Sequence, residues 1–286
     1  MADIPDKKNI RRVFRNVQKH LLIERLIRYF STNKTDLRKK ALHDVDLTAC
    51  KSILELGCAF GSFTEALKDR LHPAAKITGL DIVPEYKLFF LESCRRAGYQ
   101  GTFLSSGINY IRKYPPGYFD LVICSFALYF FAGMITEISR VLKQNGIFIT
   151  ITHHQSNMRE LIAITKTILQ RHALLENDDP LPIETIISQF SAENGGELLS
   201  QRFGRVLAID FRNSLIFKPE EINFFAEYLY FKSPFFLLGT ATSMRSIMDE
   251  LLNELKNNAR RNEFIAMNKD DRIFICSKPL PPKEQP

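Results

Sequence analysis

Two glycines follow an apolar stretch at residues 53 to 63, which read ILELGCAFGSF. Gly57 and Gly61 stand where a strand would end and a helix would begin, and glycine lets a ligand approach the backbone closely. Asp81 follows 20 residues after Gly61. At this spacing an acidic side chain can accept hydrogen bonds from ribose hydroxyl groups. These three residues predict a loop that binds an adenosine-type ligand.

The spacing of the glycines separates the classes of nucleotide-binding loop. A dinucleotide loop reads G-x-G-x-x-G or A, whereas the middle position here is Ala59 and Ser62 follows the last glycine. A phosphate-binding loop would continue into G-K-S or G-K-T, which does not follow here. A methyl group is tolerated at residue 59 when the backbone keeps a negative φ, and we expect this of Ala59. A YxxxK spacing at Tyr228–Lys232 lies far past the fifth predicted strand, so we assign it no catalytic role.

Strands and helices must alternate to position these residues. Five apolar strands are predicted, and amphipathic helices separate them. The strands are Ser52–Leu56, Lys76–Leu80, Thr102–Leu104, Phe119–Cys124 and Ile147–Ile151. Strands that are apolar throughout and separated by helices predict a parallel sheet in an α/β fold, with helices on both faces.

The alternation ends near His153. Further along, Glu263–Met267 and Arg272–Ser277 read as two strands around the turn at 268–271, which predicts a hairpin. The chain is therefore expected to divide into five segments. These are a basic amphipathic helical segment at 1–50, a ligand-binding core at 51–152, an insertion or lid forming the substrate site at 153–262, a C-terminal β-hairpin at 263–280 and a disordered tail at 281–286.

Four short blocks, in this order, resemble the class I S-adenosylmethionine-dependent methyltransferases. They are Glu55–Gly61 (ELGCAFG), Gly79–Pro84 (GLDIVP), Phe119–Ser125 (FDLVICS) and Arg140–Ile149 (RVLKQNGIFI). The resemblance implies a Rossmann-like fold with a mostly parallel seven-stranded sheet, helices on both faces and a large helical or mixed insertion after strand five. It also implies S-adenosylmethionine as cofactor and S-adenosylhomocysteine as product.

The resemblance assigns roles to residues of the glycine loop by their position. Gly57, Cys58 and Gly61 would lie along the methionine part of the cofactor. Glu55 would help to hold the amino group of the cofactor.

Residues after the second, third and fourth strands receive roles in the same way. Asp81 would bind the ribose, Ile82 would pack on the adenine and Ser125 would face the reacting centre. Many members of the family carry an acid after strand three that accepts from the adenine amino group. Here Ser106 or Asn109 offers the acceptor oxygen instead.

Polar residues at the ends of strands four and five are candidates for the acceptor site. Methyl transfer is an in-line displacement, and a general base helps when the acceptor is a hydroxyl or a protonated amine. His153 and His154 follow strand five, and Tyr129 follows strand four. Because imidazole is a base near neutral pH, we take His153 and His154 as catalytic candidates, with loop histidines or helix caps as the alternative. Tyr129 is a third candidate. Ser125–Tyr129 lacks the N/D-P-P-Y pattern, which argues against methylation of adenine N6.

The predicted insertion is rich in aromatic residues between Phe211 and Phe236. They would form an apolar acceptor pocket, or the core of the insertion or a dimer interface. The helical spacing of Phe224, Phe225 and Tyr228 favours a core for most of them.

Positive charge is concentrated near the N-terminus. Twelve basic and two acidic residues lie between Lys7 and Lys40, whereas the whole chain has a net charge of +7. A basic arm can bind nucleic acid or an anionic surface, although the exposed face of an amphipathic helix explains the same pattern. We therefore expect an enzyme that methylates an O or N atom of a small molecule, in specialised metabolism. An RNA or protein methyltransferase and a non-catalytic binding protein are the alternatives.

The remaining composition points to the cytoplasm. The five cysteines have neither disulfide-like nor metal-ligand spacing, so we expect reduced core thiols and no metal site. The N-terminus has no apolar signal region, and no apolar run is long enough to cross a membrane. The expected partner is a small-molecule substrate, with nucleic acid as the second candidate and no membrane. The oligomeric state stays open, a homodimer included.

Overall fold

The computed structural model describes residues 7–177, 179–237 and 241–280, and its contacts divide the chain into two compact units. Unit 1 consists of Met1–Lys34, His154–Ser188 and Arg212–Asp270, and unit 2 of Thr35–His153, Gln189–Phe211 and Asp271–Pro286. The segment predicted as one insertion at 153–262 is therefore divided, because residues 189–211 belong with unit 2. The predicted disordered tail at 281–286 lies outside the described residues.

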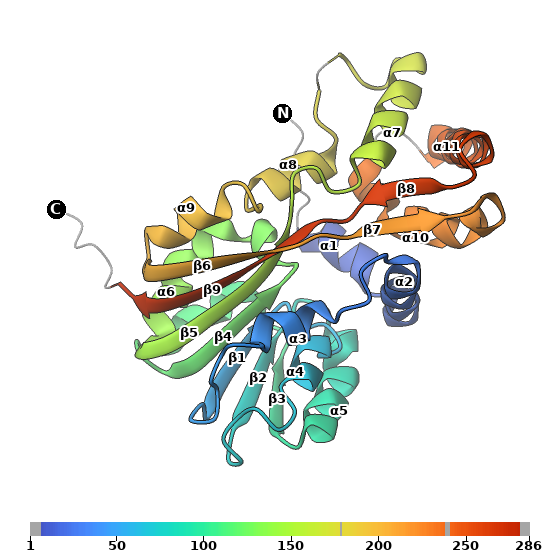
Figure 1. The fold of residues 1–286 in the computed structure, drawn as a ribbon. Coiled ribbons are helices and arrows are strands. Elements are labelled where there is room, and N and C mark those ends of the chain that lie inside the picture. The colour runs from blue at the N-terminus through green and yellow to red at the C-terminus, as the bar shows by residue number, and fades with distance from the viewer. Residues whose placement is uncertain (1–6, 178, 238–240, 281–286) are drawn as a thin grey trace. The chain divides into compact units, whose positions relative to one another are not determined.

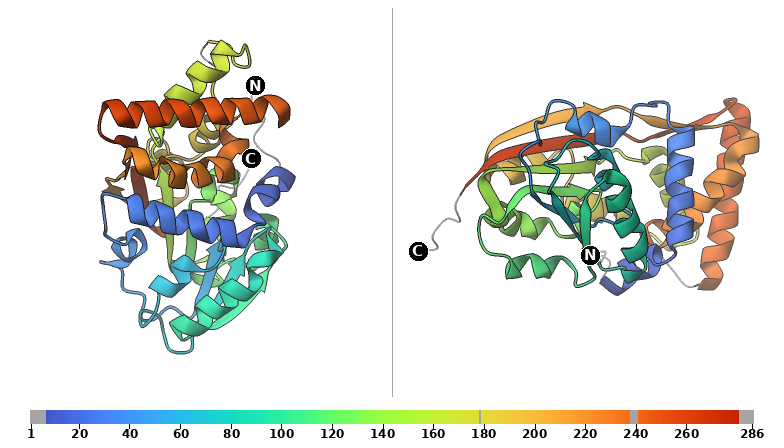
Figure 2. Two further views of the ribbon diagram at one scale, coloured as in Figure 1. Left: turned by 90° about the vertical axis from the view of Figure 1, so that its right-hand side faces the viewer. Right: turned by 90° about the horizontal axis from the view of Figure 1, so that it is seen from below.

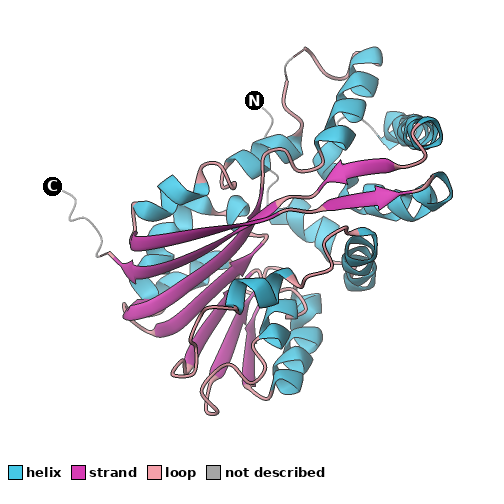
Figure 3. Ribbon diagram, viewed as in Figure 1, coloured by secondary structure: helices cyan, strands magenta, loops and turns pink. Residues whose placement is uncertain are grey.

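Unit 2 is built on a sheet in which seven strands are described, in the order β3-β2-β1-β4-β5-β9-β6 (Figures 1 and 3). The strands are β1 (Ser52–Leu56), β2 (Lys76–Leu80), β3 (Gln100–Leu104), β4 (Phe119–Ser125), β5 (Leu142–His153), β6 (Phe203–Phe211) and β9 (Asp271–Pro279). The first five pair in parallel, and β9 pairs antiparallel with both β5 and β6. The predicted mostly parallel seven-stranded sheet is thus confirmed, and the carboxyl ends of its parallel strands share one edge.

Helices cover both faces of this sheet, as the apolar strands require. Helices α3, α4 and α5 lie on one face, and α6 and α9 lie on the other (Figure 1). The helices are α3 (Leu37–Leu42), α4 (Ser62–Ala66), α5 (Lys87–Ala97), α6 (Ile135–Val141) and α9 (Gly195–Ser200), with 3-10 turns η1 (Pro84–Tyr86), η2 (Ile108–Lys113), η3 (Leu128–Phe130) and η4 (Ala132–Met134). Ile53, Leu121 and Ile149 of three neighbouring strands are completely buried between the layers. This burial holds the strand ends, and the loops that follow them, in fixed positions.

The prediction of a C-terminal hairpin at 263–280 is wrong. Strand β8 (Ile265–Asn268) pairs with β7 (Ser214–Phe217), whereas β9 pairs with β5 and β6. The polar residues between β8 and β9 are buried and do not form an exposed turn. Lys269 N donates to Asn213 O at 3.0 Å, and Asp270 Oδ1 accepts from Asn213 N at 2.8 Å. Lys269 and Asp270, which read as turn residues in the sequence, instead form hydrogen bonds with the backbone of Asn213, which lies between β6 and β7.

Unit 1 is mainly helical. Its helices are α1 (Lys7–Phe14), α2 (Val17–Phe30), α7 (Arg159–Arg171), α8 (Pro182–Ser188), the 3-10 turn η5 (Pro219–Glu221), α10 (Ile222–Phe236) and α11 (Ala241–Arg261). Helix α10 packs against both α2 and α11 (Figure 2). Helix α2 begins after Asn16, whose Oδ1 accepts from Lys19 N at 3.0 Å. It buries Ile23 and exposes Arg25, as predicted for an amphipathic helix with a basic face.

Most aromatic residues of unit 1 form its own core. Seven of them are buried, namely Phe30, Phe217, Phe225, Tyr228, Phe231, Phe235 and Phe236. By contrast, Phe224 is 55% exposed and Tyr230 46% exposed. The expectation that these side chains mainly form a core is confirmed.

Three further observations concern the described residues alone. All five cysteines are free and buried. No group of three or more His, Cys, Asp and Glu side chains is placed to hold a metal ion. No helix combines the length and the apolar character that a bilayer crossing requires.

Candidate functional site

The loop between β1 and α4 turns by placing alternate residues in the left-handed region. Gly57 has a φ of 65°, Ala59 of 44° and Gly61 of 78°. The expectation of a negative φ at Ala59 is therefore wrong. The backbone N–H of Ala59 donates to Asp81 Oδ2 at 2.9 Å, and this conformation directs it there. A hydrogen bond to a carboxylate offsets the cost of about 1–2 kcal/mol for an L-residue in this region.

Four amide hydrogens of this loop, those of Gly57, Cys58, Ala59 and Gly61, are used within the protein. Gly57 N and Cys58 N donate to Leu80 O at 2.8 and 3.3 Å. Gly61 N donates to Cys58 O at 2.8 Å. A phosphate cradle presents such groups to its ligand. The loop is consequently unsuited to phosphate, in agreement with the spacing of its glycines.

Both glycines of the loop are required by close packing. A Cβ atom on Gly57 would lie 2.7 Å from Ala127 Cβ, in the segment after β4. A Cβ atom on Gly61 would lie 2.8 Å from Ser93 Cβ on α5. The loop is thereby pressed between the end of β4 and α5, with its backbone at the carboxyl edge of the sheet.

The side chain of Cys58 points into the protein. It is 3% exposed, and its Sγ lies where a side chain on Gly79 would be. Burial raises the pKa of this thiol well above its ordinary value. Cys58 can therefore contact a ligand at this edge through its backbone, as the resemblance implies, and not through its sulfur.

Two buried carboxylates flank the loop. Glu55 accepts from Thr64 Oγ1 at 2.5 Å, and Asp81 accepts from Val83 N at 3.0 Å in addition to Ala59 N. Burial raises the pKa of Glu55 to about 7 and that of Asp81 to about 6, although backbone N–H groups act against the shift at Asp81. Two carboxylates with raised pKa favour a ligand that carries positive charge or hydroxyl donors.

The ends of β2 and β3 meet beside Asp81. A Cβ atom on Gly107 would lie 3.2 Å from Ile82 Cγ2, so the backbone after β3 touches the side chain after β2. Ile82 is half-buried there, whereas Ser106 and Asn109 are exposed. Ile82 thus offers apolar surface after β2, and Ser106 and Asn109 offer exposed polar groups after β3, which together suit a heterocyclic base.

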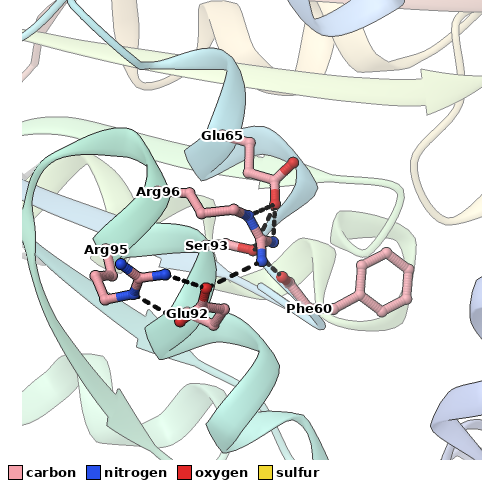
Figure 4. A network of polar contacts seen from close by, with 6 residues as sticks. All are labelled: Phe60, Glu65, Glu92, Ser93, Arg95 and Arg96. Atoms are coloured by element: carbon pink, nitrogen blue, oxygen red, sulfur yellow. Dashed lines mark hydrogen bonds and ion pairs between the residues drawn. The ribbon is translucent and has the colours of Figure 1, made fainter.

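Helix α5 anchors the far end of the loop (Figure 4). Ser93 Oγ lies 2.8 Å from Phe60 O and 2.9 Å from Glu65 Oε1. Arg96 pairs with Glu65 from the next turn of α5. These contacts tie the loop, the start of α4 and the middle of α5 into one network. They hold the loop in position.

His153 is held at the end of β5 by three neighbours within unit 2. Its Nδ1 lies 2.6 Å from Asp271 Oδ1, and its ring stacks on Phe126 at 4.7 Å and on Tyr129 at 5.8 Å between centroids. Phe126 follows Ser125 at the end of β4 and has a φ of 54°. Such strained residues cluster at functional sites.

The two candidate histidines are separated by the fold. His153 belongs to unit 2, whereas His154 belongs to unit 1 and is buried there. His154 N donates to Asp270 O at 3.2 Å. The structure thus brings Tyr129 and His153 together within unit 2.

Sequence reasoning missed Asp271 and Phe126. Asp271 was assigned to a hairpin turn, but it faces His153 in the antiparallel register of β5 and β9. Only the correct strand pairing would have identified it. Phe126 was missed because its residue type does not predict a left-handed backbone conformation.

The comparisons with known proteins agree with this geometry. Residues 54–150 match a family model described as a methyltransferase domain. A search of curated protein sequences gave no match.

Three solved structures share the fold over most of both chains. BH2331, a candidate methyltransferase from Bacillus halodurans, is 12% identical with a TM-score of 0.54, over 85% of this chain and 99% of the other. YcgJ from Bacillus subtilis is 15% identical with a TM-score of 0.51, over 84% and 97%. The [4+2]-cyclase SpnF is 14% identical with a TM-score of 0.54, over 96% and 97%. At these identities the likeness shows the fold.

The residues present fit the cofactor of this domain. S-adenosylmethionine carries an ammonium and a sulfonium group, a ribose and an adenine. Glu55 and Asp81 supply buried carboxylates, and Gly57 leaves no side chain between the loop and the end of β4. The sheet order, the loop geometry and the family match agree that residues 54–150 form a methyltransferase domain with the class I, S-adenosylmethionine-dependent fold.

Proposed function

We propose that the protein transfers a methyl group to an oxygen or nitrogen atom of a small-molecule acceptor in the cytoplasm. The observation that carries this proposal is the pair of His153 and Asp271, 2.6 Å apart, in the same unit as the cofactor residues. A hydroxyl or protonated amine must lose a proton to accept a methyl group, and a positioned imidazole removes it.

Asp271 is the positioning residue of this pair. When Nδ1 of His153 carries the proton and donates to Asp271, Nε2 is the basic atom of the neutral ring. The stacking of His153 on Tyr129 and Phe126 fixes the plane of the imidazole. His153 would take the proton of the acceptor at Nε2, and Tyr129 would form part of the acceptor wall.

The roles at the cofactor follow from the positions described above. S-adenosylmethionine, when bound, supplies an electrophilic methyl group on a sulfonium. Glu55 would accept from its ammonium group, and the backbone of Gly57, Cys58 and Gly61 would lie along its methionine part. The ribose and adenine would contact the residues that follow β2 and β3, and Ser125 would face the reacting atoms. The residues that follow β2 and β3 are Asp81, Ile82, Ser106 and Asn109.

A direct experiment tests the proposal. The protein is incubated with S-adenosylmethionine and separate pools of phenols, catechols, amines and carboxylates, and methylated products and S-adenosylhomocysteine are measured by mass spectrometry. We expect one pool to yield both in equal amounts. Loss of turnover in His153→Gln, with cofactor binding retained in calorimetry, assigns the base.

The alternatives give different results in the same assay. Methylation of RNA or protein, with no small-molecule product, indicates a macromolecular acceptor and overturns the proposal. Cofactor binding without any methyl transfer indicates a binding protein or another reaction. SpnF is named as a [4+2]-cyclase, so the shared fold does not by itself establish methyl transfer.

A further inference from the structure

A groove within unit 1 lies beside the C-terminal end of α2, β7 and η5. It is open to solvent and has a volume of about 810 Å³. Its polar lining is formed by Arg25, Arg28, Tyr29, Lys34, Lys218 and Glu221. We call this feature the basic groove.

The four cations of the basic groove are exposed. Arg25, Arg28, Lys34 and Lys218 form no ion pair with any residue that the structure describes. Other cations of unit 1 do form ion pairs, as in Lys19–Glu227, Lys166–Glu184 and Arg171–Glu250. Unpaired like charges around one groove repel one another until an anion neutralises them. Their arrangement therefore favours a ligand with several negative charges.

The carboxylate in the groove has a structural role of its own. Glu221 Oε2 accepts from Lys218 N at 2.8 Å and so caps the start of η5. Lys34 Nζ donates one hydrogen to Tyr29 O at 2.7 Å, which holds its ammonium group at the end of α2. Four cations against one carboxylate leave a net charge of +3 in the groove.

An aromatic ring stands among these cations. Tyr29 is 71% exposed, and its ring packs edge to face on Phe30 at 4.9 Å. Phe30 is buried against Phe217 at 4.2 Å. Tyr29 is consequently an exposed ring that rests against a buried aromatic side chain. An aromatic platform beside several cations is the combination that binds single-stranded nucleic acid.

A lipid surface fits these observations less well. The apolar residues Leu26 and Ile27 of α2 face Phe217, Phe225 and Tyr228 within unit 1. Because helices that lie in a membrane insert their apolar face, α2 would have to leave this packing. The exposed residues of α2 are Gln18, Leu22, Arg25, Arg28 and Tyr29, which include only one aliphatic side chain.

We propose that the basic groove binds single-stranded nucleic acid, with the phosphates along Arg25, Arg28, Lys34 and Lys218 and one base stacked on Tyr29. This inference is independent of methyl transfer, since it concerns binding within unit 1 alone. The site does not read sequence, because its groups recognise phosphate and the face of any base.

Fluorescence anisotropy with a labelled oligouridylate of twelve nucleotides tests the proposal with the full chain. Each phosphate contact to a single strand contributes about −0.7 to the slope of log K against log salt concentration. Four contacts predict a slope of about −2.8, or about fiftyfold weaker binding at 200 mM than at 50 mM salt. The double variant Arg25→Ala/Arg28→Ala should halve this slope. Tyr29→Ala should weaken binding about tenfold, and Tyr29→Phe should restore it.

The matched control is Arg260→Ala/Arg261→Ala, which removes the same charge from exposed positions on α11. Calorimetry with S-adenosylmethionine verifies that each variant is folded. Equal effects of the two double variants, or no binding of the oligonucleotide at 50 mM salt, overturn the proposal. Adenosine monophosphate that binds as tightly as the oligonucleotide overturns it too, because the occupant is then a free nucleotide. Binding to phosphatidylserine vesicles without binding to the oligonucleotide has the same consequence.

Discussion

Ala59 and Asp81 are joined by a hydrogen bond of 2.9 Å between the backbone N–H of one and Oδ2 of the other. The bond connects the middle of the glycine loop to the end of β2. A non-glycine residue is kept in a left-handed conformation to make it. The loop and the predicted ribose-binding carboxylate are therefore one structural element, and a change in either should affect both.

Ala59→Gly should stabilise the protein. The substitution removes the left-handed strain of about 1–2 kcal/mol, and the greater freedom of glycine in the unfolded chain returns about 0.4–1 kcal/mol. We expect a net gain of about 0.5–1 kcal/mol in chemical denaturation. Ala163→Gly is the matched control, because Ala163 is exposed within α7 and should lose about 1 kcal/mol. A loss of equal size in both variants would show that Ala59 carries no strain.

Cofactor binding should strengthen as pH rises from about 5 to 8. The pKa of Asp81 is raised to about 6 and that of Glu55 to about 7, so both carboxyls are largely protonated at the low end of this range. The ionised forms accept from the ribose and the ammonium group, so binding releases protons. Calorimetry in buffers of different ionisation enthalpy measures this release. Glu55→Gln should abolish its part above pH 6, and a pH-independent affinity would contradict the assignment.

The raised pKa of Glu55 also makes the free energy of unfolding depend on pH. The folded-state pKa of about 7 lies above the ordinary value of 4.5, so the folded protein holds more protons than the unfolded chain between these values. The free energy of unfolding without cofactor should therefore fall as pH rises through 4.5 to 7. In Glu55→Gln this component of the fall should disappear, as measured by denaturant titration at each pH.

Asp271→Asn should lower kcat at least tenfold with little change in the Kd of S-adenosylmethionine. An amide can still contact His153 Nδ1, but it no longer fixes the protonated tautomer or stabilises the imidazolium. Asp210→Asn is the control, since Asp210 pairs with Arg272 on the neighbouring strand. If both variants lose cofactor affinity and kcat together, Asp271 acts only on the stability of the sheet.

Lys232→Met should stabilise the protein near neutral pH. Lys232 Nζ lies over the rings of Phe14, Phe231 and Phe235, and burial lowers its pKa from 10.5 to about 7. The unfolded chain therefore binds more protons between pH 7 and 10.5, and the free energy of unfolding rises with pH across this window. Methionine avoids the buried charge and still packs on the rings.

The expected gain for Lys232→Met is about 2–4 °C in Tm at pH 7, and it should shrink toward pH 10. Lys87→Met replaces an exposed lysine on α5 and should show no such trend. A lower Tm at pH 7 would mean that the cation–π contacts outweigh the cost of burial.

The sheet, its strand ends and the glycine loop were predictable because local patterns specify them. Strands β1, β2 and β4 are mostly apolar, and Asp81 follows the last residue of β2. The pairing of β9 with β6 was not predictable. Strand β6 lies at the edge of the sheet and is largely exposed between Phe203 and Phe211, so it lacks the apolar signal of a buried strand.

The candidate site was predicted in the same uneven way. Glu55, Gly57 and Gly61 belong to one short motif, so their spacing identified them together. Asp271 lies 118 residues from its partner His153, and only the antiparallel register joins them. The left-handed backbone of Ala59 and Phe126 results from tertiary contacts that residue type does not encode.

The place of β9 between β5 and β6 has a consequence for anyone who excises the recognisable part of the gene. A fragment cut to residues 54–150 would end within β5 and would lack the two strands that complete the sheet. The long, apolar β5 would then be an open edge, and open apolar edges pair with other chains. Such a fragment should precipitate or form fibres, although it contains the whole cofactor motif. Strands β6 and β9, which follow residues 54–150 in the sequence, are thus expected to protect that part of the chain from aggregation.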